Sequence, residues 1–170
     1  MSAARGLVAL LVVSAAVVLQ VSLFPHVAWE GVVPNLALLV VVGAALVRGP
    51  ETAAALGFLA GAMIDLAPPA DHIAGRWALA LVVVGYLAGR MRQEARPSAT
   101  AVVATVAAAS FVGSSVFALS GLLLRDPVLA VTDIVEVVLV AVVWDVLLTP
   151  FVLPPVMALF RRLEPAKVAW

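Results

Sequence analysis

Long apolar runs alternate with short polar breaks along the chain. A window of about 19 residues finds six apolar segments, at positions 6–24, 33–47, 53–66, 74–91, 101–124 and 131–149. Charged residues collect between these segments, which is typical of membrane-spanning helices and not of a transmembrane β-barrel. The pattern predicts an all-α integral membrane protein, a six-span helical bundle forming a single transmembrane domain over residues 1–170.

The second and third segments are shorter than the roughly 20 residues that a helix needs to cross a hydrocarbon core. Between them lies Arg48-Gly49-Pro50-Glu51, where proline lacks an amide donor and glycine favours a turn. Joining the two segments into one membrane-spanning helix would bury the charges of Arg48 and Glu51 in the membrane. We therefore expect two separate helices.

The distribution of basic residues predicts the orientation. With a cytoplasmic N-terminus, six spans leave only Arg76 and Arg125 outside. An excess of Lys and Arg marks cytoplasmic loops, so both termini are expected in the cytoplasm. Eight basic residues then lie inside: Arg5, Arg48, Arg90, Arg92, Arg96, Arg161, Arg162 and Lys167.

Three prolines follow the last segment, at positions 150, 154 and 155. Proline removes a helical hydrogen bond and clashes with the preceding turn. We expect the prolines to kink or end the last helix, leaving a short proline-interrupted segment over residues 150–170 on the cytoplasmic side.

Composition agrees with a membrane protein, since 65% of the 170 residues are hydrophobic and 12% are charged. The net charge is zero, and no basic cluster with aromatic neighbours suggests nucleic-acid binding. The chain has no cysteine, which excludes disulfides and zinc sites built on sulfur. The lipid bilayer is the expected environment.

Few side chains could carry catalysis. His26 and His72 fall in predicted outer loops, belong to no HExxH pair and are expected at the surface. Ser110 and Ser114, four residues apart, suggest close helix contact with a hydrogen bond across it. We expect no catalytic residue, no metal site and no cofactor, and therefore no enzyme.

Small residues and one carboxylate recur at helical spacing in the third segment. Gly57, Gly61 and Asp65 share one helix face, and Gly85 and Gly89 repeat the spacing in the fourth. Such pairs let transmembrane backbones touch, either inside the protein or against a partner helix. We expect Asp65 to be held by a hydrogen bond at the outer end of its helix.

Three further acids are candidate intramembrane polar anchors, since a charge inside the membrane usually marks a pathway, a partner or an internal pair. Glu136 lies one turn after Asp133 on the same face, whereas Asp145 points to roughly the opposite side. They therefore form no carboxylate dyad. We expect Asp145 near the cytoplasmic interface, capped by Arg161 or by the loop over residues 90–96.

Several of these residues also carry a resemblance that covers nearly the whole chain. The chain resembles the bacterial rod shape-determining protein MreD family. The matching residues are Pro34-Asn35-Leu36, Gly57-Phe58, Gly61, Asp65-Leu66, Gly75, Ala78-Leu79, Gly85-Tyr86, Leu147-Leu148-Thr149-Pro150 and Arg161-Arg162.

The resemblance implies a non-enzymatic scaffold of the cell-elongation machinery, located in the bacterial inner membrane. It implies association with the bitopic protein MreC and, through it, with MreB, RodA and a penicillin-binding protein. The family is also similar in architecture to the substrate-binding subunits of energy-coupling-factor vitamin transporters. That alternative requires a cavity with convergent polar groups and orienting aromatic residues.

Overall fold

The computed structural model describes residues 3–29, 31–68, 72–91, 97–125 and 134–163. This part of the chain forms α-helices and one short 3-10 helix, and its only β-pairing is an isolated bridge between Trp29 and Val32. The all-helical class expected from the hydropathy pattern is confirmed. The elements are α1 (Ala3–Ser22), η1 (Phe24–Val27), α2 (Leu36–Arg48), α3 (Pro50–Leu66), α4 (Arg76–Arg90), α5 (Ala99–Leu123) and α6 (Ile134–Arg162).

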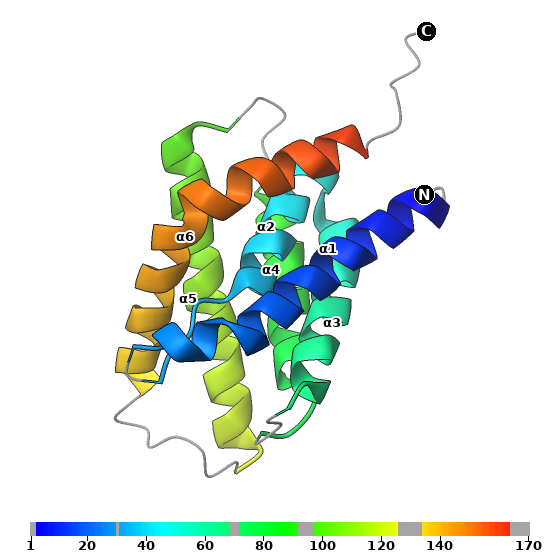
Figure 1. The fold of residues 1–170 in the computed structure, drawn as a ribbon. Coiled ribbons are helices and arrows are strands. Elements are labelled where there is room, and N and C mark those ends of the chain that lie inside the picture. The colour runs from blue at the N-terminus through cyan, green and yellow to red at the C-terminus, as the bar shows by residue number, and fades with distance from the viewer. Residues whose placement is uncertain (1–2, 30, 69–71, 92–96, 126–133, 164–170) are drawn as a thin grey trace, which may run out of the picture.

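Helix α2 lies at the centre of the bundle and contacts each of the other five α-helices (Figure 1). All residues from Leu36 to Val47 are buried, and a helix that is apolar on every side is suited to such a position. Its 13 residues extend about 20 Å, less than the roughly 30 Å of a hydrocarbon core. The first turn of α2 is therefore enclosed, and its free N–H groups require partners inside the protein.

The predicted break between the second and third segments is confirmed. Only Gly49 separates α2 from α3, and its φ of 87° is a conformation that residues with a side chain rarely adopt. Pro50 begins α3, where a missing amide donor costs nothing because the first N–H groups of a helix are unpaired. The sequence therefore turns sharply here instead of continuing one helix.

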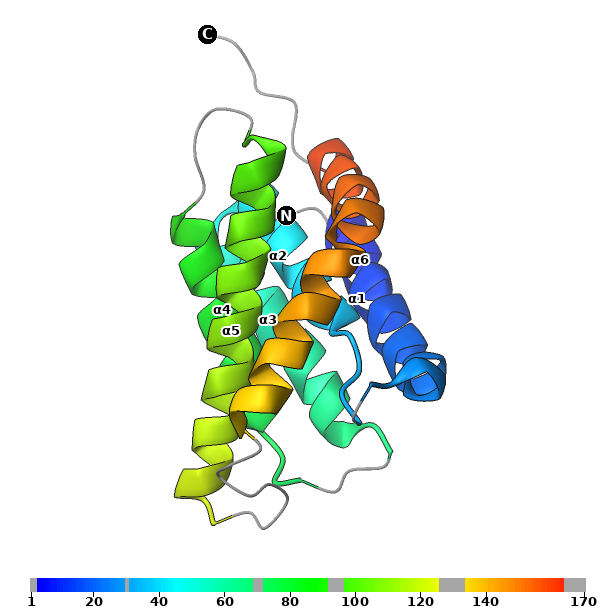
Figure 2. The ribbon, with the colours of Figure 1, turned by 90° about the vertical axis from the view of Figure 1, so that its left-hand side faces the viewer.

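Helix α6 passes through Pro150, Pro154 and Pro155 without ending. The prolines kink the helix, as one of the two expected outcomes, and Figures 1 and 2 show its change of direction. Its last turns cross the end of the bundle, where the side chains of Leu153 and Val156 contact Gly43 of α2. Up to Arg162, the segment after Pro150 is thus a continuation of α6 and part of the core.

Three helices, α1, α5 and α6, are long and apolar enough to cross a membrane, and α2 is a shorter apolar helix. The start of α1 and the ends of α2, α4 and α6 lie at the same end of the bundle (Figure 1). At that end Arg48 Nη1 donates to the carbonyl of Leu163 at 3.4 Å. Arg76 begins α4 and Arg125 follows α5, at the opposite end.

Candidate functional site

The glycine stripe of α3 packs against α4. A Cβ atom on Gly57 would overlap the backbone of Leu81, and one on Gly61 would overlap the backbone of Trp77 and Ala78. In return, Gly85 and Gly89 of α4 meet the backbone of the first turns of α3. The two helices therefore touch through their main chains, which only glycine permits at these four positions. The stripe faces the protein's own fourth helix.

Asp65 ends this seam and caps the N-terminus of α4. Its side chain is 2% exposed, and each carboxylate oxygen is close to two donors. Three of the donors are backbone N–H groups: Gly75 to Oδ2 at 2.9 Å, Trp77 to Oδ1 at 3.1 Å and Ala78 to Oδ2 at 3.0 Å. An anion at a helix N-terminus is stabilised by the helix dipole as well as by these bonds. Asp65 thus joins the end of α3 to the start of α4.

Gly75 makes this cap possible because of its backbone conformation. Its φ is 99°, in the left-handed region that glycine adopts at little cost. A residue with a side chain would strain the turn that brings the Gly75 N–H to Asp65.

His72 provides the fourth contact to Asp65, with Nε2 3.0 Å from Oδ1. Its side chain is only 11% exposed, so the expectation that His72 is a surface residue is wrong. The expectation failed because the His72 ring lies against Asp65 and against the ring of Phe117, with ring centroids 5.4 Å apart. His26, the other histidine, is exposed as expected.

A buried arginine begins α4, beside the Asp65 cap. Arg76 is 4% exposed, and its Nε and Nη2 donate to the carbonyl of Phe117 at 3.3 and 2.8 Å. The guanidinium lies 3.9 Å from the centre of the Phe117 ring, a favourable cation–π distance. Trp77 stacks on the same ring, with centroids 4.4 Å apart. Phe117 therefore links α5 to the first turn of α4.

The buried N-terminus of α2 is capped by three side chains from different parts of the chain. Asn35 Oδ1 accepts from the N–H of Leu38 at 2.9 Å, as an N-cap residue does. Gln20 Oε1, from α1, accepts from Ala37 at 3.0 Å, and Asp145 Oδ1, from α6, accepts from Asn35 at 2.8 Å. Three of the first free N–H groups of α2 are thereby satisfied.

Asp145 also connects α6 to α5, because its Oδ2 accepts a hydrogen bond from Ser110 Oγ at 2.7 Å. Asp145 is 1% exposed and Ser110 is fully buried. The expectation of a hydrogen bond across a helix contact is confirmed for Ser110. The expectation that Asp145 lies at the cytoplasmic interface near Arg161 is wrong, because α6 continues beyond Pro150 and leaves Asp145 inside the bundle.

Of the two remaining candidate acids, Glu136 and Asp133, the structure describes only Glu136. Glu136 lies in the first turn of α6, where its side chain is exposed. Negative charge in a first turn is favourable, which explains its position without a buried partner. Asp133 lies outside the described residues.

A cavity of about 370 Å³ lies beside the α2 N-terminus. Its walls come from α1, the segment before α2, α4, α5 and α6. None of the described residues that line it carries a charge. They are Gln20, Gly31, Val32, Val33, Asn35, Trp77, Ser114, Phe117, Ala118, Ile134, Val137, Val138 and Ala141.

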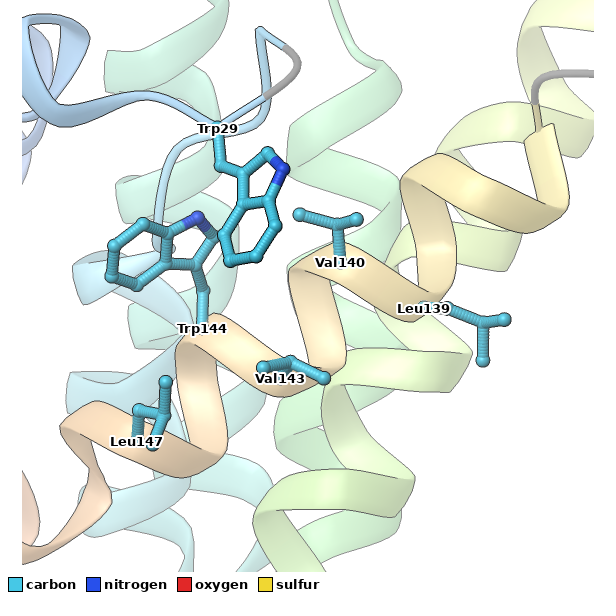
Figure 3. A pocket seen from close by; sticks show the side chains of 6 residues that line it. All are labelled: Trp29, Leu139, Val140, Val143, Trp144 and Leu147. Atoms are coloured by element: carbon cyan, nitrogen blue, oxygen red, sulfur yellow. The ribbon is translucent and has the colours of Figure 1, made fainter.

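An apolar groove runs along the outside of α6, where Trp29 stands beside Trp144 (Figure 3). Leu139, Val143 and Leu147 continue the surface along the helix. Within the described part of the chain, Trp144 Nε1 is buried without a hydrogen-bond partner. The groove offers apolar contact but no group for acid–base chemistry.

The polar groups of the bundle satisfy helix ends instead of forming a reactive set. Both oxygens of Asp65 and both oxygens of Asp145 are occupied by donors. Among the described residues, no group of three or more His, Cys, Asp or Glu side chains could hold a metal ion. The arrangement is chemically suited to fixing helix positions.

Sequence reasoning missed Gln20, Arg76 and Phe117. Asn35 was the one local signal for the cap of α2, since an asparagine directly before an apolar helix is a typical N-cap residue. No local pattern could have paired Gln20 or Asp145 with that helix, because they lie 17 and 110 residues from their partners.

Comparison with known proteins gives one finding about identity. The model of a family described as "rod shape-determining protein MreD" matches residues 2–163. Because the match spans nearly the whole chain, the chain belongs to this family, whose members are shape-determining structural membrane proteins. No curated protein and no solved structure matches the chain.

Proposed function

We propose, from the premise that the chain is a member of the MreD family, that it is a non-enzymatic scaffold of the cell-elongation machinery. In this role it binds an MreC-like bitopic membrane protein and couples lateral peptidoglycan synthesis to MreB, with RodA and a penicillin-binding protein as indirect partners. The family match over residues 2–163 carries this proposal. The structure supports it with a helical bundle in which two buried carboxylates, Asp65 and Asp145, cap helices.

The proposed topology has six spans, with both termini in the cytoplasm of a bacterial cell and the bundle in its inner membrane. Arg48 at the end of α2, Arg90 at the end of α4 and Arg161 near the end of α6 lie at one end of the bundle. An excess of basic residues at one end is the signature of the cytoplasmic side. Cysteine labelling of single-cysteine variants at Arg48 and at Arg125 tests this orientation, since only the Arg125 variant should react from outside.

The contacts of the glycine stripe restrict where a partner binds. Gly57, Gly61, Gly85 and Gly89 are occupied by the contact between α3 and α4. A partner helix would therefore bind elsewhere, on faces such as the exposed apolar row of α6 that includes Leu139, Val143 and Leu147.

Co-purification from native membrane tests the proposed function. A tagged full-length chain should recover a single-span protein with a coiled-coil segment, and depletion of the chain should turn rod-shaped cells round. Intact rod shape after depletion, together with no such partner in the purified material, would contradict the scaffold function.

The second candidate function is a substrate-binding subunit of an energy-coupling-factor vitamin transporter. The cavity beside α2 is the observation that favours it, because aromatic walls and buried amides are typical of ligand sites. The same co-purification separates the two candidates, since a transporter subunit should recover an ATPase module instead of a bitopic protein.

A further inference from the structure

The cavity beside the α2 N-terminus presents amide donors whose orientation is fixed by the helix. Gln20 and Asn35 are each 6% exposed. Both use their side-chain oxygen to cap α2, Gln20 for Ala37 and Asn35 for Leu38. On each amide the oxygen already accepts a hydrogen bond from α2, so the NH2 group is free to donate to another partner.

Neither NH2 group donates a hydrogen bond within the described part of the chain, although both side chains line the cavity. Both NH2 nitrogens keep accessible surface, since Trp144 Nε1 is the only fully buried side-chain nitrogen or oxygen without a partner in the described part of the chain. Two such donors beside one cavity mark a place where acceptor oxygens would be bound. Ser114 adds a hydroxyl to the same wall.

The remaining walls define the rest of the ligand. The rings of Trp77 and Phe117, which are stacked on each other, and the aliphatic side chains of α6 give the cavity a mainly apolar surface. No charged side chain among the described lining residues could pair with an ion, and an unpaired buried charge is costly. The cavity is thus suited to an uncharged molecule.

We propose that this cavity binds an uncharged amphiphile, whose carbonyl or hydroxyl oxygens accept hydrogen bonds from Gln20 and Asn35 and whose apolar part packs against Trp77 and Phe117. The ester and glycerol region of a membrane lipid has this chemistry, and so does a small neutral ester from the aqueous side. The site is distinct from the scaffold role and does not depend on a bitopic partner.

Native mass spectrometry of the full-length protein in nanodiscs tests the charge preference. The probes are monoolein, oleate and oleylamine, which share a chain length and differ in the charge of the head group. Monoolein should bind as one copy per protein, at least about tenfold more tightly than either charged probe. Equal binding of the three probes, or no binding of monoolein, would overturn the proposal.

Two variants locate the site on α6. Ala141→Phe fills the cavity while leaving the residues that cap α2 unchanged, and it should weaken monoolein binding at least about tenfold. Ala158→Phe makes the same change at an exposed residue of α6 that lies outside the cavity lining, and it should leave binding unchanged. Equal effects of the two variants would contradict a site in this cavity.

Gln20→Glu tests the donor itself. Glutamate keeps an oxygen for Ala37 but replaces the NH2 group with a second acceptor, so monoolein binding should fall about tenfold while oleylamine binding rises. Unchanged selectivity in folded Gln20→Glu protein would show that Gln20 is not the donor. If this variant does not fold, the Ala141→Phe comparison still decides the proposal.

A fourth probe, monobutyrin, distinguishes a ligand that comes from the membrane from one that comes from the aqueous side. Monobutyrin carries the same glycerol ester as monoolein on a short, water-soluble chain. Binding of monobutyrin at comparable affinity would support a small neutral ester from the aqueous side, and binding of monoolein alone would support a membrane lipid.

Discussion

Asp65 and Asp145 both accept hydrogen bonds at the N-terminus of a helix other than their own, yet different groups donate to them. Asp65 receives three backbone N–H groups, which can only donate. Asp145 receives one backbone N–H and the hydroxyl of Ser110, which can reverse its role and accept. A buried carboxylate is therefore needed as a carboxylate where fixed donors reach both of its oxygens, as they do in Asp65 but not in Asp145.

The surroundings of the two acids differ as well. Asp65 lies at the end of the seam between α3 and α4, where the preceding glycines hold the two backbones together. Asp145 lies inside the bundle and joins α6 to α5 and to the first turn of α2. One cap depends on a rigid backbone contact and the other on side chains from three helices.

The largest effect should come from separating the two helices beside Asp65. Gly61→Leu would force side-chain atoms into the backbone of α4, moving Trp77 and Ala78 away from the carboxylate. We expect a loss of more than about 3 kcal/mol of stability, since overpacking already costs about 1–3 kcal/mol where only side chains must shift. Size-exclusion chromatography of the detergent-solubilised protein should show little monodisperse material.

Ala55→Leu is the matched control, because Ala55 is on the exposed side of α3. It should yield as much monodisperse protein as the unchanged chain. Full recovery of Gly61→Leu with loss of partner binding would mean that the stripe serves a partner helix.

Asp65→Asn should have the next largest effect. An amide offers one oxygen, so whichever way it is turned, at least one backbone N–H of the α4 cap would face an NH2 group. We expect a loss of about 2–3 kcal/mol from unsatisfied donors and a weaker helix-dipole interaction. The thermal unfolding midpoint should fall by about 5–10 °C for a chain of this size, and an unchanged midpoint would contradict the cap.

Asp145→Ala should cost somewhat less, about 2 kcal/mol, because it leaves two buried donors, Asn35 N–H and Ser110 Oγ, instead of three backbone donors. Thermal unfolding of the same preparation measures the loss. A variant as stable as the unchanged chain would show that these two hydrogen bonds contribute nothing to the bundle.

Asp145→Asn should have the smallest effect, below about 1 kcal/mol. The amide oxygen can accept from Asn35 while the NH2 group donates to Ser110, whose hydroxyl then accepts. Combining this change with Ser110→Ala removes the acceptor and should lower the unfolding midpoint further. If the free energy of unfolding lost in the double variant equals the sum of the losses in the two single variants, the Ser110 hydroxyl does not change from donor to acceptor.

Much of this arrangement could be predicted from the sequence, where it depends on local spacing. The glycine stripe, the break at Gly49 and Pro50, and the hydrogen bond of Ser110 across a helix contact follow from helical periodicity and backbone chemistry. The contributions of Gln20 and Asp145 to the cap of α2 could not be predicted, since these side chains reach it only through tertiary packing. The contact of the part-buried His72 with Asp65 was missed because loop conformation is not encoded in hydropathy.

Amide hydrogen exchange in the Asp65→Asn and Asp145→Asn variants tests the difference between the two carboxylates most directly. Exchange reports local opening of a helix terminus. In Asp65→Asn, exchange at Ala78 and its neighbours in α4 should accelerate by at least about tenfold, while in Asp145→Asn exchange at Asn35 and in the first turn of α2 should stay within about threefold of the unchanged protein. Equal acceleration at both helix termini, or a larger one at α2, would contradict the assignment of Asp65 as the obligatory carboxylate.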